Sequence, residues 1–407
     1  MDRHYLMHKL LFFIFNFSFL LGAGGGGPVS QDSGSFLMIF KEFVNVVSEP
    51  IISFTLLTVV FPFLFPPTDW FDKIHRKLGL HYMWTNPGGY VLFIITTVFF
   101  YLGYKDPYFS IILNKPDNFP IVLMAYSMLF VIWYSMKKAY INDARLEAGK
   151  KPREYNDPED KVLVWPDLVY IEFICLLIFM AFLTIWAIMF SAPLEEPANA
   201  AATPNPSKAP WYFLGLQEML VYFDPWIAGI VFPIFIILGM CAIPYMDINK
   251  NGDGYYSYKE RRVGIFIFMY GWVALWLYLI VIGTFFRGPN WNFYGPFEWW
   301  DPHKLEVLNN VNLSEYVWVY LLGQETPSNI LVRESVGFIL VFAYLFGLPL
   351  FLSQTLLKNM YKAYGPVRYA SLCIFGLTML SLPIKMFLRW TINLKYIVYI
   401  PEWFFNI

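Results

Sequence analysis

Charged residues are scarce in this 407-residue sequence, where Asp, Glu, Lys and Arg together make up only 14%. A soluble domain usually carries about 25%. The formal net charge is −1, which argues against the basic surface of a nucleic-acid-binding protein. In place of charge, 57% of the residues are hydrophobic and 21% are aromatic. The composition therefore predicts an integral membrane protein.

Cysteine and histidine are also few, which limits the cofactors that the chain could hold. The three cysteines lie in apolar stretches without the spacing of a disulfide or ligand pair, and no C-x-x-C-H string is present to attach a c-type haem. None of the five histidines lies inside a predicted span, and a b-type haem clamped between two membrane helices needs histidines at that depth. We expect no haem b and no metal site on this chain. The histidines are His4, His8, His75, His81 and His303.

Nine apolar segments approach the roughly 20 residues that a membrane span requires. Backbone groups in lipid must be satisfied within each segment, so all nine are predicted to be helices. The sequence thus predicts an all-α integral membrane protein. The segments cover residues 10–21, 51–66, 89–104, 120–136, 168–190, 226–245, 263–286, 335–357 and 369–387.

Lysine and arginine predict the orientation of these spans. The connecting segments fall into two alternating sets, with 19 Lys and Arg in one set and nine in the other. Basic residues favour the inner side of the membrane, which places the N-terminus inside and the C-terminus outside. Residues 1–27 resemble a signal peptide, which we interpret as a retained anchor; cleavage would leave eight spans.

The spans are divided by a charged inner-face linker at 137–164. Upstream, residues 28–136 carry membrane helices without a recognised motif. Downstream, residues 290–334 form an outer segment rich in aromatic residues, and residues 335–407 hold two further helices and a tail.

A Pro-rich loop precedes the span at 226–245, and it contains the string Ala209-Pro210-Trp211-Tyr212. This loop resembles the one between helices E and F of the cytochrome b family, where a Pro-Glu-Trp-Tyr string borders the site of quinol oxidation. The glutamate of that string is absent here, and the nearest downstream carboxylate is Glu218. The resemblance covers about residues 165–289. This segment resembles the C-terminal half of cytochrome b, which in some lineages is a separate polypeptide called subunit IV.

The resemblance implies roles for individual residues. Pro210, Trp211 and Tyr212 would line a quinone pocket, and a short helix over 211–222 would bring Glu218 to it. Quinol oxidation releases protons, so Glu218 would act as the acceptor, with Tyr212 as a second catalytic residue. Two alternatives remain open: Glu218 as a solvated carboxylate, and the aromatic residues as an interfacial belt.

The protein is predicted to be a haem-free membrane subunit of an oxidoreductase that transfers electrons from quinol to cytochrome c or to a similar acceptor. The subunit is not expected to be active alone. It would act in respiratory or photosynthetic electron transfer in a bacterial-type inner membrane. The implied partners are a haem-bearing cytochrome b-like subunit, a Rieske-type iron–sulfur protein, c-type cytochromes and membrane lipids. The alternative is a non-catalytic membrane scaffold whose quinol site has decayed.

Two further motifs are interpreted as structural. Pro401-Glu402-Trp403-Phe404 is close to the family string, but it lies in the tail with no helix after it, so we expect an interfacial anchor. Residues 247–253 open like an EF-hand loop, but the twelfth position is Tyr258 and not a bidentate glutamate. A tight turn explains this second motif better.

Overall fold

A computed structural model describes residues 36–115, 118–156, 163–190, 197–248, 255–306 and 309–407. These residues are mainly helical, and the only sheet in the described part of the chain is the short antiparallel pair of β1 (Tyr399–Ile400) and β2 (Phe405–Asn406). The all-helical fold predicted from the sequence is confirmed.

Within the described residues, seven helices are long and apolar enough to cross a membrane. They are α5 (Asn86–Lys105), α7 (Phe119–Glu147), α8 with the turn before it (Val164–Met189), α10 with the turn before it (Ile227–Met246), the run from α11 through α12 (Arg262–Phe286), α15 with α16 (Ser335–Gln354), and α17 (Lys358–Ile392). An eighth span arises if α2 (Phe36–Ser48) and α3 (Pro50–Leu64) count as one, with a bend of 78° between them. The ninth predicted span, at 10–21, lies outside the described residues.

Several of these spans are composed of shorter helices joined through π-helical turns. Their component α-helices are α8 (Val169–Met189), α10 (Phe232–Met246), α11 (Arg262–Met269), α12 (Tyr278–Val281), α15 (Ser335–Phe342) and α16 (Leu348–Gln354). Shorter helices sit between the spans: α4 (Asp69–Lys77), η1 (Leu80–Trp84), α6 (Phe109–Leu113), η4 (Trp211–Phe213), α9 (Leu214–Met219), α13 (Leu313–Glu315) and α14 (Ile330–Arg333).

Proline and glycine set several of the helix boundaries. Pro50 occupies the first position of α3, where its missing N–H costs nothing and its fixed φ suits the start of a helix. Gly365 interrupts α17 with a φ of +74°, which glycine adopts without strain, and Pro366 follows it. The last span therefore begins at Lys358 and kinks, whereas the sequence predicted a start at residue 369.

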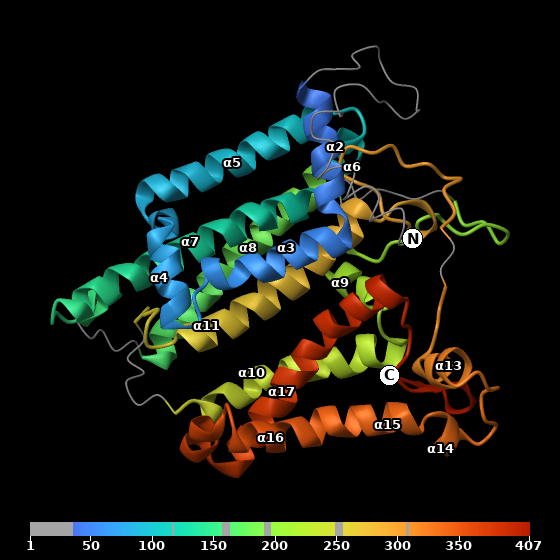
Figure 1. The fold of residues 1–407 in the computed structure, drawn as a ribbon. Coiled ribbons are helices and arrows are strands. Elements are labelled where there is room, and N and C mark those ends of the chain that lie inside the picture. The colour runs from blue at the N-terminus through green and yellow to red at the C-terminus, as the bar shows by residue number, and fades with distance from the viewer. Residues whose placement is uncertain (1–35, 116–117, 157–162, 191–196, 249–254, 307–308) are drawn as a thin grey trace.

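The connecting segments gather at two opposite ends of the bundle (Figure 1). We call the end with α4, the end of α7 and the start of α11 the inner end, and the end with α9, α13 and α14 the outer end. Arg262 lies 2.5 Å from Asp69, and Ser257 donates to Asp143 at 3.0 Å, so three predicted inner segments contact one another. The predicted alternation of loops is present in the fold.

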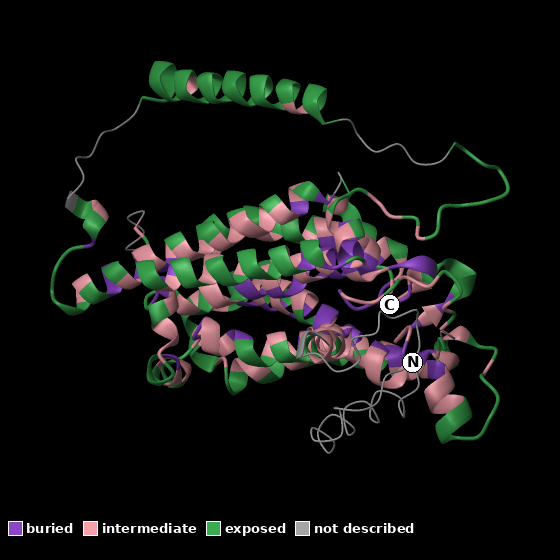
Figure 2. Ribbon diagram, turned by 90° about the horizontal axis from the view of Figure 1, so that it is seen from above, coloured by how far each residue is buried: buried purple, intermediate pink, exposed green. Residues whose placement is uncertain are grey.

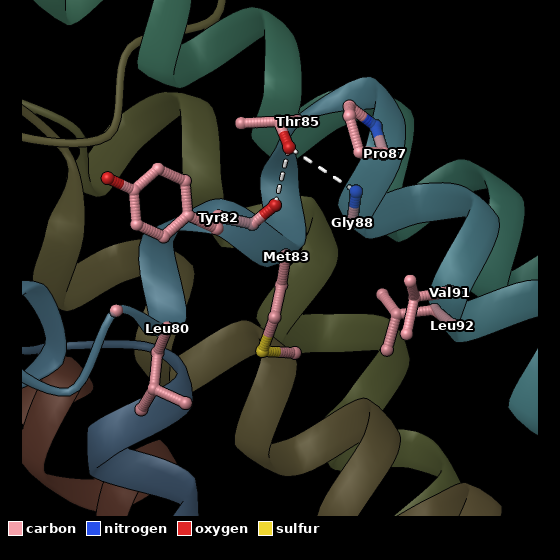
Figure 3. A pocket seen from close by; sticks show the side chains of 9 residues that line it. Leu80, Tyr82, Met83, Thr85, Pro87, Gly88, Val91 and Leu92 are labelled. Carbon is pink, nitrogen blue, oxygen red and sulfur yellow. Dashed lines mark hydrogen bonds between the residues drawn. The ribbon is translucent and has the colours of Figure 1, made fainter.

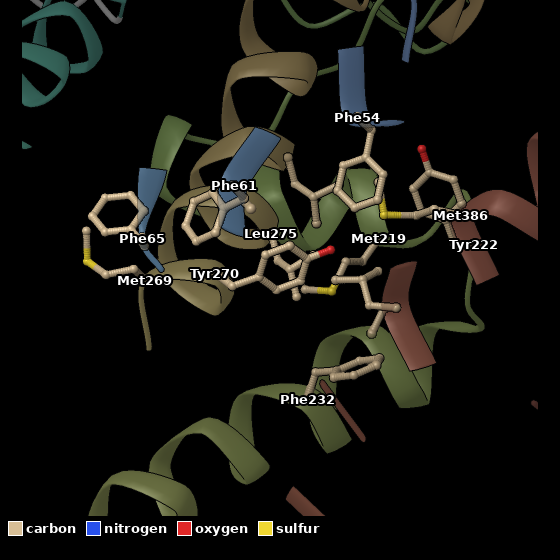
Figure 4. Close-up of a cluster of buried hydrophobic side chains, with 14 of the residues drawn as sticks. Phe54, Phe61, Phe65, Met219, Tyr222, Phe232, Met269, Tyr270, Leu275 and Met386 are labelled. Atoms are coloured by element: carbon tan, nitrogen blue, oxygen red, sulfur yellow. The ribbon is translucent and has the colours of Figure 1, made fainter. Parts of the chain in front are cut away.

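The hydrophobic core lies where α3, α9, α17 and the run from α11 to α12 meet (Figure 4). Phe54 and Phe61 of α3 are almost completely buried there, as is Met386 of α17. Met219, the last residue of α9, packs into the same cluster. The short helix after the Pro-rich loop is thereby fixed to the centre of the molecule.

The helix α8 differs from every other span. In Figure 2 it is the long, almost entirely exposed helix that lies apart from the bundle. Trp186 and Phe190, at its outer end, contact the ring of Phe119 at centroid distances of 5.7 and 6.4 Å. None of its apolar stretch is buried, against 33% for the run Arg262–Phe286.

Candidate functional site

The Pro-rich loop leads into two short helices at the outer end. Pro210 precedes η4, which contains Trp211 and Tyr212, and α9 follows it directly. The predicted helix over 211–222 is thus split in two, and its regular part ends at Met219. Glu218 lies in the last turn of α9 on the side that faces the core.

Glu218 forms a buried ion pair with Arg287, which follows the span Arg262–Phe286. The Nη2 atom of Arg287 lies 2.6 Å from Oε1 of Glu218, and Nε lies 3.0 Å from Oε2. The pair is therefore bidentate, the strongest arrangement of arginine on a carboxylate. Glu218 is 0% exposed, so it is not a solvated interface carboxylate.

Two more side chains donate hydrogen bonds to the same carboxylate. The hydroxyl of Tyr222 donates to Oε1 at 3.3 Å, and Nε1 of Trp291 donates to Oε2 at 3.2 Å. A carboxylate offers about four acceptor positions on its two oxygens. The two contacts from Arg287 and these two together occupy all four, so the hydrogen-bonding capacity of Glu218 is filled within the chain.

Burial and charge both act on the pKa values around this carboxylate. Burial raises the pKa of Tyr222 well above its ordinary value, and the negative charge of Glu218 acts in the same direction. Burial alone would lower the pKa of Arg287, but the charge of Glu218 and its hydrogen bonds outweigh this and raise it. Arg287 stays a cation and Tyr222 stays a neutral donor at every physiological pH.

A strained turn wraps around the arginine. Asn290 and Trp291 both have a φ of +58°, the left-handed region that residues other than glycine rarely adopt. This turn brings the carbonyl oxygen of Trp291 to 3.0 Å from Nη1 of Arg287. Trp291 thereby contacts both members of the ion pair, since its ring donates to Glu218.

The Pro-rich loop is tied to this turn and to the preceding span. Asn205 and Asn290 exchange two hydrogen bonds, from Nδ2 of Asn205 to Oδ1 of Asn290 at 2.8 Å and from the Asn290 amide to Oδ1 of Asn205 at 2.6 Å. Nζ of Lys208 donates to the carbonyl of Thr284 at 2.8 Å. Gln217 bridges back to Ala209 and Ser207. The loop that carries the family-like string is therefore held in place by polar contacts.

The aromatic residues at 211–213 differ in their surroundings: the first packs into the protein and the next two face outward. Trp211 packs on a second hydrophobic cluster that includes Phe109, Ile112 and Phe285. Tyr212 keeps 50% of its surface exposed, and so does Phe213. One ring anchors the loop, while the next two form an aromatic surface that is open to a ligand, lipid or partner.

A groove of about 480 Å³ lies far from these residues, at the inner end between η1 and the start of α5 (Figure 3). Its walls are almost wholly apolar, with Met83, Val91 and Leu92 pointing into it. Thr85 caps α5 at its rim by accepting from the Gly88 amide at 3.3 Å. The groove is not part of the outer-end site.

The remaining sequence candidates have structural partners. Glu402 of the tail string forms an ion pair with Arg333 at 3.0 Å, which suits an anchoring role, while Trp403 and Phe404 are exposed. His75 is fully buried at the inner end and contacts the Phe63 carbonyl through Nδ1 at 2.7 Å and the Tyr140 hydroxyl through Nε2 at 3.0 Å. Most of the EF-hand-like segment lies outside the described residues.

Sequence reasoning did not find Arg287 and Trp291. One feature of the sequence could have pointed to Arg287, because it is the first charged residue after an uncharged span and is predicted to lie on the same side of the membrane as Glu218. The sequence did not show that Arg287 and Glu218, 69 positions apart, form a pair.

Residues 197–295 match the family described as cytochrome b(C-terminal)/b6/petD, which is about a quarter of the chain. No solved structure matches the chain. The match includes the Pro-rich loop, α9, α10, Glu218 and Arg287, and it begins after α8. The part of this membrane protein from residue 197 to residue 295 is therefore similar to the C-terminal domain of cytochrome b.

Proposed function

We propose that this protein is a haem-free membrane subunit of a quinol-oxidising electron-transfer complex and forms part of its outer-face quinol pocket. Its partners would be a haem-bearing cytochrome b-like subunit, a Rieske-type iron–sulfur protein and c-type cytochromes. The membrane would be a bacterial-type inner membrane, with the outer end of the bundle on the outer side. The observation that carries the proposal is the family match over the loop that holds Trp211 and Tyr212.

The exposed surface of Tyr212 and Phe213 fits the wall of such a pocket. Sites for small apolar ligands are lined mainly by aromatic and hydrophobic side chains with a few polar groups. Tyr212 supplies both a ring and a hydroxyl, and Trp211 anchors the loop beneath it. A partner subunit would close the pocket over this surface.

The filled hydrogen-bonding capacity of Glu218 favours a positioning role over direct proton acceptance. To accept a quinol proton, the carboxylate would have to give up a contact with Arg287, Tyr222 or Trp291. With those contacts kept, the ion pair holds α9 and the turn at 287–291 together beneath the loop. Glu218 as the proton acceptor remains a prediction that the pH dependence of turnover can test.

The experiment for the pocket compares two exposed tyrosines in the intact complex. Tyr212→Ala should lower kcat/KM for quinol at least about tenfold, the effect of about 1.4 kcal/mol that a buried aromatic contact can supply. Tyr245→Ala is the matched control, because Tyr245 is 78% exposed at the inner end of α10. Equal, near-normal turnover in both variants would refute the pocket.

The two roles of Glu218 differ in a second measurement. A general base usually contributes at least about a hundredfold to the rate, so if Glu218 is the proton acceptor, we expect Glu218→Gln to lower quinol oxidation at least roughly tenfold. A proton acceptor predicts that the acidic limb of the pH–rate profile disappears in Glu218→Gln and persists in Arg287→Lys. A positioning role predicts that both variants lower the rate while the shape of the profile stays the same.

The scaffold alternative is favoured by the same ion pair. A carboxylate that is buried and fully bonded within its own chain needs no substrate to explain it. A scaffold would lose assembly when the ion pair is broken and would tolerate Tyr212→Ala without any change in turnover.

A further inference from the structure

Within the described residues, the helix α8 leaves almost its whole surface uncovered, apart from the contact of its outer end with Phe119. Its span has the highest mean hydropathy of the seven, 2.6, and 0% of its apolar stretch is buried. Every residue from 164 to 189 is exposed except Val169 and Trp186, which are partly buried. Lipid tails cover Leu, Ile and Phe as well as a protein does, so exposure of these side chains alone does not indicate a partner.

Glu172 is the residue that lipid does not satisfy. The span of 26 residues is about 39 Å long at 1.5 Å per residue, and the hydrocarbon layer is about 30 Å thick. Glu172 lies eight positions after Val164, about 12 Å along the helix, which places it roughly 7 Å inside the layer. Its side chain is exposed and forms no hydrogen bond or ion pair with any described residue.

The ionisable groups of other spans show how this chain satisfies such residues elsewhere. Asp143 of α7 accepts from the Ser257 hydroxyl at 3.0 Å and from the Tyr258 amide at 3.2 Å. Lys385 of α17 is buried and donates to the Lys395 carbonyl. Ionisable residues at membrane depth pair with one another or with backbone groups. Glu172 therefore indicates a partner from outside the described residues.

We propose that α8 is a docking surface for a transmembrane helix of another subunit that carries a lysine or arginine at the depth of Glu172. The charge of Glu172 selects a cationic partner, and the exposed apolar side chains on the same face supply the packing. A second copy docked through α8 would place two Glu172 carboxylates against each other, which like-charge repulsion disfavours. The inference depends on the membrane setting of α8 and not on the quinol pocket.

The first test places a photocrosslinking residue on α8 in native membranes. Leu176 lies one turn from Glu172 on the same face, and Ile174 lies on the opposite face. Light should attach position 176 to one other membrane subunit, at a peptide with a lysine or arginine within one helical turn, and should do so more strongly than position 174. Attachment to lipid only, to a second copy of this chain, or to a peptide without a basic residue would overturn the proposal.

The second test reverses the charge. Glu172→Lys should lower the crosslinking yield from position 176 at least about tenfold, since juxtaposed like charges cost several kcal/mol and 1.4 kcal/mol is tenfold. Changing the crosslinked basic residue of the partner to glutamate should restore the yield. Ile174→Lys introduces the same charge on the other face and should leave the yield within about twofold. An equal loss in Ile174→Lys, or no recovery in the charge swap, would overturn the proposal. Neither crosslinking result tests the proposed quinol pocket, which is tested by the turnover of the Tyr212 variant.

Discussion

The outer and inner ends of the bundle both bring charged residues together, but they bury them to different degrees. At the outer end, Glu218 is 0% exposed and the side chain of its partner Arg287 is 11% exposed. At the inner end, Lys259 pairs with Glu147 while both side chains remain more than two fifths exposed. Water screens the attraction within the inner pair, whereas the outer pair is largely removed from solvent. Removing one member of the outer pair would therefore leave the other charge buried without a partner.

This difference explains how each end is held together. At the outer end, the buried pair of Glu218 and Arg287 links α9 to the turn at 287–291. The inner end combines ion pairs that stay open to solvent, such as Arg262 with Asp69, with buried polar contacts. Asn142 is fully buried there, and Asp143 accepts from backbone amides of the segment that begins at residue 255. Variants at the two ends should therefore have effects of very different size.

The largest effect should follow the loss of one outer partner. Arg287→Leu leaves the Glu218 carboxylate buried without its cation, which usually costs about 3–5 kcal/mol. We expect a large drop in the thermal unfolding temperature of the detergent-purified protein. The control is the double variant Glu218→Leu/Arg287→Leu, which removes both charges and should recover most of the loss. A single variant as stable as the double one would contradict the comparison.

A smaller effect should follow Asn142→Leu at the inner end. The Asn142 side chain donates to Glu154 at 2.7 Å and to the Tyr256 carbonyl at 2.9 Å, and accepts from the Arg153 amide at 2.9 Å. Leucine has a similar volume but leaves these groups unpaired, which costs about 1–3 kcal/mol. A thermal unfolding temperature equal to that of the Arg287→Leu variant would show that the inner end is as dependent on single residues as the outer end.

The sequence predicts those features of the fold and the site that depend on neighbouring residues, and it does not predict those that depend on contacts between distant residues. Hydropathy is local, so seven of the eight predicted spans that fall within the described residues appear there as helices of membrane-spanning length. The predicted span at 51–66 reaches that length only if α3 is counted together with α2, and the start of α17 differs from the prediction by a full kinked segment. The string at 209–212 is local too, and it located the loop and Glu218. The pairing of Glu218 with Arg287 is not local, and neither composition nor spacing encodes it.

The same reasoning explains the exposure of Tyr212 and Trp211. Both are aromatic residues at the end of a Pro-rich loop, and nothing in the string indicates which ring turns inward. The answer comes from Phe109 and Ile112, about a hundred positions earlier, which provide the cluster on which Trp211 packs. The orientation of a side chain at the end of a loop is set by tertiary contacts of this kind.

The inner end should also respond to acid through His75. Burial is the main cause that lowers the pKa of His75 below its ordinary value of 6.5, and the Phe63 carbonyl opposes it. The unfolded chain then binds a proton that the folded one does not, so stability is present above pH 6.5 and is lost as the pH falls below it. His75→Gln should reduce the fall in unfolding temperature between neutral and mildly acidic pH. An unchanged slope would show that other groups cause the acid sensitivity.

The smallest effect should come from the exposed pair of Lys259 and Glu147. Both side chains are hydrated in the folded and unfolded chain, so their attraction is weak and is reduced further by salt. Glu147→Gln keeps the length of the side chain, removes its charge and replaces one acceptor oxygen by a donor NH2 group. We expect a change in unfolding free energy of at most about 0.5 kcal/mol, and we expect it to become smaller as salt is added. Glu218→Gln makes the identical chemical change at the buried pair, where salt has no access, and should cost several times more. If the two substitutions have equal cost at the same ionic strength, burial is not what separates the two ends, and the difference would have to come from the geometry of the pairs instead.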